Sequence, residues 1–348
     1  MTAHCWLAPP DSRGRLHSIT PTAGVLATPA AFLHVLRSSP HMRAAAILGL
    51  GCSPKNLKPF QTEQNVDWSI GLPGERDQAD VVLLFGGDGT VHRHLGQLVR
   101  LGLPVLIVPA GSGNDFARAL GFRRVRDSLA CWHKFCSGAG NMRHIDLGVI
   151  VPLDNAGEAP APRYFACVAG VGLDAEVARR ANRIPRWLRG NGGYALTLVP
   201  TIFRFAPFLM KILTHSEAVL GEHSSANSAE PAPNRDWTIR SNQPTVLAAF
   251  ANAPLYGGGM KIAPRAKMDD GLLDICIIGA VDPFKLFCLF PTVYAGRHLK
   301  LREVEYSQAA RVRIETEHPL DIYADGEFVC QTPAEIGVER EVLRIVTP

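Results

Sequence analysis

The chain has 348 residues, of which 47% are hydrophobic and 20% are charged. This composition is typical of a soluble globular protein and excludes a disordered chain, and the length predicts about two domains. The net charge of +4 is too small to indicate a nucleic-acid partner, although it suits an anionic substrate or membrane surface. The eight cysteines form no C-x-x-C pair, so we interpret them as reduced thiols of a cytoplasmic protein.

The N-terminal region has no basic start followed by an apolar run, so we expect no secretory signal. Residues 1–41 also lack helical or strand periodicity. They are interpreted either as a flexible tail or as a sequence upstream of a true start at Met42. The most apolar stretch, Leu196 to Leu213, is interrupted by two prolines and Arg204, and we do not expect it to span a membrane.

Residues 42–143 are predicted to form an α/β domain with the layout of a nucleotide-binding fold. The apolar runs Ala44–Leu50, Val81–Phe85 and Val105–Val108 do not alternate with polar residues, which is typical of buried parallel strands. The last two runs are each followed by a glycine-rich turn and a helical pattern, Val91–Leu101 and Asp115–Leu120. Ligands bind at the carboxyl ends of strands in this layout.

Residues 144–348 are predicted to form a second, mostly antiparallel, β-sandwich-like domain. One largely helical region, Asp174–Leu213, interrupts the strands, and Gly221–Asp236 is predicted to be an exposed, mobile loop. The strands are expected at Ile145–Val151, Tyr164–Ala169, Thr238–Arg240, Val246–Ala251, Leu272–Ile278, Ala310–Ile314, Leu320–Tyr323 and Val342–Val346.

The segment Gly86-Gly87-Asp88-Gly89-Thr90 follows a predicted buried strand and precedes a helix. Glycines let the backbone approach a ligand closely, and N–H groups at a helix N-terminus bind phosphate oxygens. Asp88 would repel phosphate unless Mg²⁺ lay between them, so the carboxylate indicates a metal–nucleotide complex. The alternative is a tight turn in which Asp88 caps the helix.

A second loop, Pro109–Ala117, repeats the arrangement after the next strand. Taken alone it could be a helix start capped by Asn114 or Asp115. Taken with the first loop it predicts the other wall of one phosphate-binding cleft. No Walker A lysine pattern and no complete G-x-G-x-x-G follows a strand, which excludes the P-loop and the Rossmann cofactor site.

Together the two loops resemble the diacylglycerol kinase catalytic-domain family, which includes bacterial lipid kinases and sphingosine kinases; NAD kinases and phosphofructokinases are more distant relatives. The resemblance covers about Ala44 to Pro348, with the motifs in the family's order. It continues through Asp146–Gly148, Gly170–Asp174, Asn252, Tyr256–Met260, Pro264–Asp274 and Asp325–Glu327.

The resemblance implies that ATP and Mg²⁺ are the cofactors. Asp88, Asp115 and Asp146 would hold the catalytic Mg²⁺, partly through water, and Asp270 with the carbonyls of Lys267 and Leu272 would bind a structural Mg²⁺. Glu327 would be the general base, with Asp325 beside it. The residues expected to bind ATP are Gly86, Gly87, Asp88, Gly89, Thr90, Val91, His92, Gly111, Ser112 and Asn114.

The sequence departs from the family pattern in three places. The family's first Asn-Pro-x-Ser-Gly loop is replaced by Gly49–Lys55, and the helix and strand that follow it look shortened. His92 replaces the usual Asn and Ser112 the usual Thr. His92 and His94 are not expected to share a metal ion, because residues two apart on a helix point to different faces.

The function predicted is an ATP- and Mg²⁺-dependent kinase that phosphorylates a lipid hydroxyl, of the diacylglycerol or sphingoid type, at the inner face of the cytoplasmic membrane. The alternatives are an NAD kinase-like or other small-molecule kinase, and a catalytically weak lipid-binding regulatory protein. Five arginines around Trp187 in Ala178–Arg189 suit an anionic membrane interface or, equally, a solvated face. No nucleic-acid partner is expected, and a homodimer is kept open beside a monomer.

Overall fold

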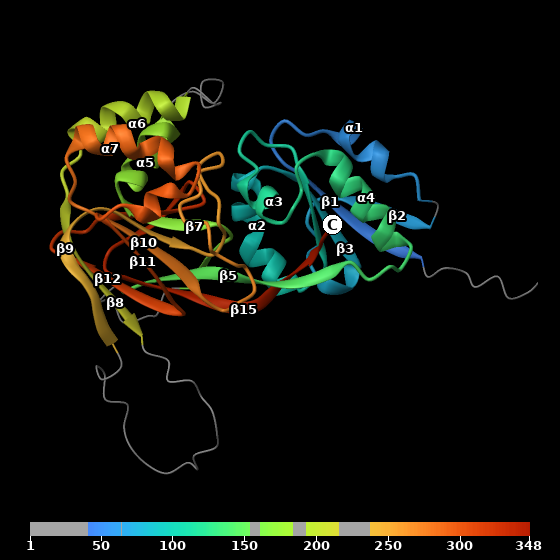
Figure 1. Ribbon diagram of the computed structural model, residues 1–348. Coiled ribbons are helices and arrows are strands. Elements are labelled where there is room, and N and C mark those ends of the chain that lie inside the picture. Colours follow the sequence, from blue (N-terminus) through green and yellow to red (C-terminus); the bar gives the residue numbers. More distant parts are fainter. Residues whose placement is uncertain (1–40, 64, 154–160, 184–192, 216–236) are drawn as a thin grey trace, which may run out of the picture. The chain divides into compact units, whose positions relative to one another are not determined.

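We describe a computed structural model that covers residues 41–63, 65–153, 161–183, 193–215 and 237–348 (Figure 1). The expected tail 1–40, the expected loop Gly221–Asp236 and the stretch around Trp187 lie outside these residues. The seven cysteines within the described residues are free thiols, as expected.

The N-terminal region contains a four-stranded parallel sheet in the order β2-β1-β3-β4. Its middle strands are buried on both faces, which explains their unbroken apolar sequences. The strands are β1 (Met42–Leu48), β2 (Val66–Ile70), β3 (Val81–Gly86) and β4 (Val105–Pro109). The helices are α1 (Pro54–Leu57), α2 (Asp88–Leu101), α3 (Asp115–Ala119) and α4 (Val125–Cys136), with short 3₁₀ turns η2 (Lys58–Phe60) and η3 (Arg76–Gln78).

Helix α2 shows how the sequence specifies this region. Its apolar residues recur at helical spacing, so Val91, Leu95 and Leu98 are buried on one side. The helix ends at Gly102, which has a φ of 59°, a conformation that glycine adopts without steric cost. Its first residue is Asp88, and β3 and the following turn therefore deliver this carboxylate to the end of the sheet.

The strands that follow pair mostly antiparallel, in the order β14-β13-β7-β9-β8-β12-β15. Strand β10 pairs with β9 and β11 with β10, whereas β5 pairs with β15 and β6 with β5. These strands are β5 (Met142–Pro152), β6 (Arg163–Phe165), β7 (Val168–Gly172), β8 (Phe208–His215), β9 (Trp237–Ala251), β10 (Leu273–Gly279), β11 (Val304–Ala309), β12 (Arg311–Thr316), β13 (Asp321–Ala324), β14 (Glu327–Gln331) and β15 (Ala334–Val346). The helices here are α5 (Leu173–Arg183), α6 (Gly193–Arg204) and α7 (Pro283–Leu289), with 3₁₀ turns η5 (Phe290–Val293) and η6 (Arg297–Lys300).

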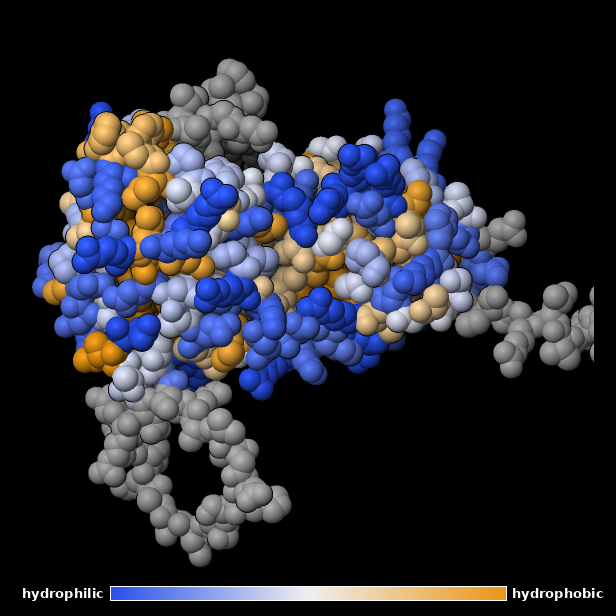
Figure 2. All heavy atoms as spheres, in the orientation of Figure 1, coloured by the Kyte–Doolittle hydropathy of each residue, from blue (hydrophilic) through white to orange (hydrophobic). Residues whose placement is uncertain are grey.

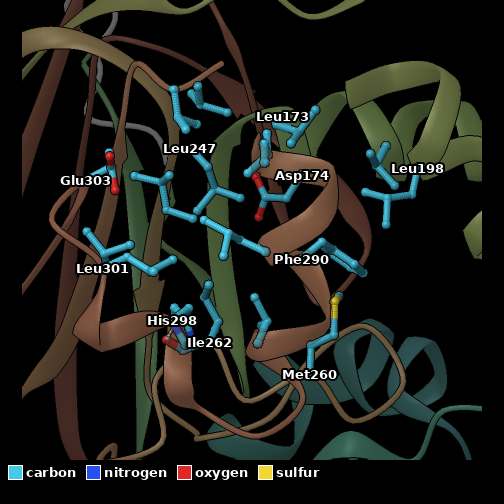
Figure 3. Close-up of a pocket in the computed structure, with 18 of the residues that line it drawn as sticks. Leu173, Asp174, Leu198, Leu247, Met260, Ile262, Phe290, His298, Leu301 and Glu303 are labelled. Carbon is cyan, nitrogen blue, oxygen red and sulfur yellow. Dashed lines mark hydrogen bonds between the residues drawn. The ribbon is translucent and has the colours of Figure 1, made fainter. Parts of the chain in front are cut away.

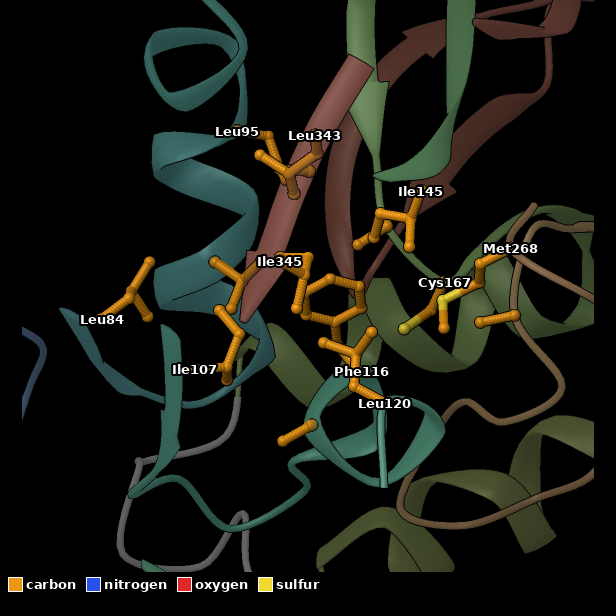
Figure 4. Close-up of a cluster of buried hydrophobic side chains, with 14 of the residues drawn as sticks. Leu84, Leu95, Ile107, Phe116, Leu120, Ile145, Cys167, Met268, Leu343 and Ile345 are labelled. Atoms are coloured by element: carbon orange, nitrogen blue, oxygen red, sulfur yellow. The ribbon is translucent and has the colours of Figure 1, made fainter. Parts of the chain in front are cut away.

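Strand β15 connects the two regions. It pairs antiparallel with β5 along most of its length, and its Ile345 pairs parallel with Val105 of β4. Figure 4 shows Leu343 and Ile345 of β15 in one buried cluster with Leu95 of α2 and Phe116 of α3. A second core, containing Phe165, Met210, Phe250 and Ile314, is formed by the antiparallel strands alone. The predicted boundary between residues 143 and 144 falls inside β5.

The predicted fold class, an α/β domain followed by a mostly antiparallel β-sandwich-like region, is confirmed. Several elements were predicted wrongly. The expected helical region does not continue to Leu213, because β8 begins at Phe208 and pairs with both β9 and β12. Tyr164–Ala169 is divided between two strands, whereas Thr238–Arg240 and Val246–Ala251 belong to the single strand β9. Strands β11 and β14 and helix α7 were not predicted.

Candidate active site

The two glycine loops lie directly against each other at the ends of β3 and β4. The N–H of Ala110 donates to the carbonyl of Gly86, and a Cβ built on Gly111 would lie 2.4 Å from the Cα of Gly87. No side chain fits at either position, so the glycines are required by the approach of the two backbones. The loops therefore form one structure, as the sequence predicts.

The side chains in and after these two loops differ in their surroundings: one bonds to the loop backbone, one is exposed and one lies in the core. Asn114 has a φ of 56°, and both ends of its amide bond to the backbone of Gly111, so it fixes the shape of the second loop. Ser112 is exposed at the tip of that loop. The side chain of Val91 lies in the core. ATP contacts by Asn114 and Val91 stay predictions, and the structure shows a structural role for each.

Asp88 and Asp115 form a pair of adjoining carboxylates. The carboxylate of Asp88 accepts hydrogen bonds from the backbone N–H groups of Asp115 and Phe116, at 3.1 and 3.0 Å, and so caps α3. Asp115 accepts from Arg118 at 2.5 Å and from the N–H of Gly258 at 2.7 Å. Burial, with the nearby charge of Asp115, raises the pKa of Asp88 to about 6.

Asp325 anchors the turn between β13 and β14. Its carboxylate accepts hydrogen bonds from the backbone N–H groups of Ala166, Cys167 and Val168 and lies 3.2 Å from Nδ1 of His92. Its φ of 51° turns the chain sharply, and the side chain is almost fully buried. These contacts make Asp325 a positioning group, which the sequence alone did not indicate.

Glu327 is the first residue of β14 and is exposed. Its carboxylate lies beside the first glycine loop, because a Cβ built on Gly89 would be 3.5 Å from Oε1 of Glu327. The turn before Glu327 is also fixed from α5, where Asn182 donates to the carbonyl of Gly326 at 2.9 Å. The first glycine loop, to which the sequence assigns phosphate binding, is therefore adjacent to Glu327, to which it assigns the role of the base.

Asp146 belongs to a different set of contacts. It accepts hydrogen bonds from the N–H groups of Gly271 and Glu341, at 2.7 and 2.8 Å, and is 2% exposed. It thereby ties β5 to the segment Lys267–Leu272, where Asp270 accepts from the N–H of Leu272. The structure does not show Asp146 in contact with Asp88 or Asp115, and both Mg²⁺ sites remain predictions.

The carboxylates only partly fit a metal ion. Within the described ranges, no three His, Cys, Asp or Glu side chains are arranged around one metal position. Asp88 and Asp115 nevertheless fit a divalent cation, because their repulsion is one of the causes that raise the pKa of Asp88. A cation would relieve this repulsion, and Mg²⁺ prefers oxygen ligands with several waters retained.

A cavity opens between the acidic residues and α5. It is lined by Asp88, Asp115, Cys167, Asp174, Tyr256 and Asp325, among others. Asp174 and Tyr256 also line a second cavity, which is otherwise almost entirely apolar and includes Leu198, Met260, Leu286 and Phe290. Figure 3 shows Asp174 among the apolar side chains of this second cavity. The acidic and the apolar cavity are therefore neighbours.

Asp174 ends the motif Gly170–Asp174, but the sequence alone indicates no role for its carboxylate. Gly170 leaves room for this carboxylate, since a Cβ there would lie 1.8 Å from Oδ2 of Asp174. Burial raises the pKa of Asp174 to about 7, even though the N–H of Ala175 donates to it. A half-buried carboxyl group with a raised pKa between two cavities is a candidate ligand-binding group.

The replaced first loop packs on the glycine–aspartate loop. Gly49 donates its N–H to the carbonyl of Phe85, and a Cβ on Gly49 would lie 2.6 Å from Oγ1 of Thr90. The helix and strand that follow, α1 and β2, are short, as predicted. Gly49 therefore supports the glycine–aspartate loop, although the family's usual residues are absent.

The basic segment of α5 is only partly described. Arg179 and Arg180 both form ion pairs with Glu176, at 2.7 and 2.6 Å, which offsets part of their charge. Arg186, Trp187 and Arg189 lie outside the described residues. No helix among the described residues is long and apolar enough to cross a membrane.

Comparison with known proteins agrees with this geometry. Residues 64–150 match the model of the diacylglycerol kinase catalytic domain, and residues 167–347 match the YegS C-terminal NAD kinase beta sandwich-like domain. A diacylglycerol kinase of Mycobacterium tuberculosis is 34% identical over 270 residues, covering 77% of each chain. One from Bacillus subtilis is 24% identical over 271 residues, covering 77% of this chain and 78% of the relative.

The fold also matches solved structures. A crystal structure titled as a diacylglycerol kinase from Bacillus anthracis has a TM-score of 0.57 at 17% identity. The match covers 88% of this chain and 97% of that chain. The two chains therefore share a fold over most of their length.

Proposed function

We propose that this chain, which belongs to the diacylglycerol kinase family, transfers the γ-phosphoryl group of ATP to the hydroxyl group of a membrane lipid. Diacylglycerol is the first candidate substrate, because the relatives from M. tuberculosis and B. subtilis carry that name. The observation that carries the proposal is the pair of neighbouring cavities, one acidic and one apolar, which share Asp174 and Tyr256.

The phosphate end of the reaction is assigned to the two glycine loops. Backbone N–H groups at the start of α2 can donate hydrogen bonds to phosphate oxygens. Because Gly87 and Gly111 have no side chains, nothing at these positions blocks the approach of phosphate. Asp88 and Asp115 are the residues that would hold Mg²⁺, which would neutralise charge on the transferred phosphoryl group. Phosphoryl transfer depends mainly on such positioning and charge neutralisation.

Glu327 is assigned as the base. It takes the proton of the lipid hydroxyl while the new bond forms from that oxygen to the γ-phosphorus, and the bond from the γ-phosphorus to the β,γ-bridging oxygen breaks to release ADP. Its exposed carboxylate beside Gly89 supports this role. Asp325 positions Glu327 through the turn between β13 and β14.

The lipid end is assigned to the apolar cavity, where a hydrocarbon chain would replace water. Asp174, at the junction of the cavities, is placed to accept a hydrogen bond from the polar part of the lipid. The apolar lining favours a lipid over the dinucleotide or sugar-phosphate of the alternative small-molecule kinases. Glu327 beside the glycine loop argues against a regulatory protein without activity, since binding alone needs no base.

The proposal is tested by incubating the purified protein with ATP labelled on the γ-phosphate and a panel of lipids. The panel contains dioctanoylglycerol, a long-chain diacylglycerol in vesicles, sphingosine and ceramide, with NAD as the competing acceptor. We expect labelled phosphate on a lipid, lost when EDTA removes divalent cations. Labelling of NAD alone, or of no acceptor, would contradict the proposal.

A further inference from the structure

Helices α6 and α7 each carry apolar residues on a buried side and on a second, exposed side. On α6, Leu198 and Ile202 are buried, whereas Val199 and Phe203 are 38% and 49% exposed. An amphipathic surface helix normally carries its apolar residues on one side only. A helix that is apolar on both sides is expected to be covered on both.

Helix α7 has the same property in only seven residues. Leu286 lines the apolar cavity, whereas Phe284 and Phe287 are 67% and 41% exposed. The rings of Phe203 and Phe287 lie 5.8 Å apart, so the exposed sides of α6 and α7 form one surface. Tyr294, which is 47% exposed and contacts Phe290 edge to face, follows in the next segment.

We call Val199, Phe203, Phe284, Phe287 and Tyr294 the α6–α7 apolar face. Figure 2 shows hydrophobic residues gathered over these two helices. Single exposed apolar residues need no explanation, but a contiguous group indicates an interaction site.

The charges around this face are mostly positive, although Asp282 caps α7 and Glu303 forms an ion pair with Lys285. No Asp or Glu occurs in Gly193–Arg204 or in Pro283–Leu301, whereas Arg204, Lys285, Arg297 and Lys300 do. Aromatic and aliphatic groups near which cations outnumber carboxylates fit the surface of a bilayer that contains anionic lipids. The α6–α7 apolar face therefore combines exposed apolar side chains with nearby cations, the two features that favour binding to an anionic membrane.

We propose that the α6–α7 apolar face inserts into the membrane surface and that lipid passes between α6 and α7 into the apolar cavity. The proposal rests on the proposed function, because the same two helices line that cavity from inside with Leu198 and Leu286. The acyl chains of the bilayer at the outer side of α6 and α7 and a lipid chain in the cavity would then lie in one continuous apolar environment. This surface differs from the basic segment Ala178–Arg189 that the sequence suggested.

The test is co-sedimentation of the full chain with vesicles of phosphatidylcholine and 30% phosphatidylglycerol, comparing the wild type with the double variant Phe284→Ser/Phe287→Ser. The matched control is Ile70→Ser/Ile239→Ser, which removes two residues that are 62% and 55% exposed elsewhere. We expect the phenylalanine variant to bind vesicles at least about tenfold more weakly and the control to bind normally. Both variants remove exposed groups, so their melting temperatures should stay close to the wild type.

Kinase assays separate this proposal from the proposed function. With lipid in vesicles, the phenylalanine variant should lose activity in proportion to its binding; with monomeric dioctanoylglycerol, it should keep the wild-type rate. Equal vesicle binding by variant and wild type would overturn the docking proposal while leaving the kinase assignment intact. A wild type that binds no vesicles but forms a dimer dispersed by the variant would also overturn it, because the face would then bind a second copy. Failure to phosphorylate any lipid would instead overturn the proposed function.

Discussion

Nδ1 of His92 lies 3.2 Å from Oδ2 of Asp325, and this contact joins the helix of the glycine–aspartate loop to the turn that carries Glu327. Burial lowers the pKa of His92, but the hydrogen bond to Asp325 and the charges of Asp325 and Glu327 outweigh it, so the pKa is raised. The replacement of the family's usual Asn at this position, which the sequence left without interpretation, thus provides a contact between the two sides of the candidate site.

This contact predicts energetic coupling between His92 and Asp325. In a double-mutant cycle of His92→Ala and Asp325→Asn, followed by urea unfolding, we expect a coupling of about 0.5–3 kcal/mol. The matched cycle uses His94→Ala, because His94 lies on the same helix and its Nδ1 lies 3.4 Å from Oε1 of Gln97 in that helix. That cycle should be additive. If the His92 cycle were also additive, the contact between His92 and Asp325 would contribute nothing to the free energy of unfolding.

The position of Glu327 predicts a loss of turnover without loss of nucleotide binding. Glu327→Gln keeps the size of the side chain but cannot accept the proton, so kcat should fall by roughly 10²–10⁴-fold. The KM for ATP should change little, since the nucleotide contacts are assigned to Gly86–Thr90. Glu317→Gln, at another exposed position of the same region, is the control and should keep wild-type kcat. Near-normal turnover of Glu327→Gln on a confirmed lipid substrate would exclude it as the base.

The close approach of Gly87 and Gly111 predicts that a methyl group cannot be added there. Gly111→Ala would place Cβ 2.4 Å from the Cα of Gly87, so the loops must separate. Overpacking of this kind costs about 1–3 kcal/mol of stability, and ATP affinity should fall with the loop geometry. Calorimetry with and without ATP measures both effects. Gly74→Ala, whose Cβ would have only Gln78 atoms nearby, at 3.6 Å or more, should be tolerated.

Asp174 predicts a pH dependence of stability. Its pKa of about 7 in the folded protein is above that of an exposed carboxyl, so the folded state binds the proton more tightly. The stabilisation from this group is therefore complete below about pH 4, declines as the pH rises to about 7, and changes little above that.

The variant Asp174→Asn isolates this effect, because the amide does not titrate. Relative to the wild type, its free energy of unfolding should increase between pH 4 and pH 8, by an amount on the order of a few kcal/mol. Denaturant unfolding at several pH values gives the difference. A difference that stays constant over this range would mean that Asp174 is charged throughout in the folded protein.

The sequence predicted those parts of the site that are determined locally. Gly87 and Gly111 sit in strand–loop–helix units, where a few neighbouring residues specify both the turn and the close backbone approach. The same holds for Asp88, which a buried strand places at the start of α2. Such patterns can be recognised in the sequence because no distant contact is needed to form them.

The parts that the sequence did not predict depend on distant partners. His92 and Asp325 are 233 residues apart, and nothing near His92 indicates that the turn after β13 will face it. Phe208 starts a strand and not the end of a helix, because β9 and β12 are available on either side. The position of Asp174 between two cavities likewise depends on α6 and α7, which lie later in the chain.

The pairing of β15 with both β4 and β5 has a consequence for the order of folding. Strand β4 would be an open edge of the parallel sheet until Ile345 reaches Val105, and β15 is synthesised after all the other strands described. The half with the parallel sheet, although it comes first in the sequence, cannot complete that sheet before the antiparallel half has been made. During synthesis the exposed edge of β4 is a site for wrong pairing, and the two halves acquire their final structure together.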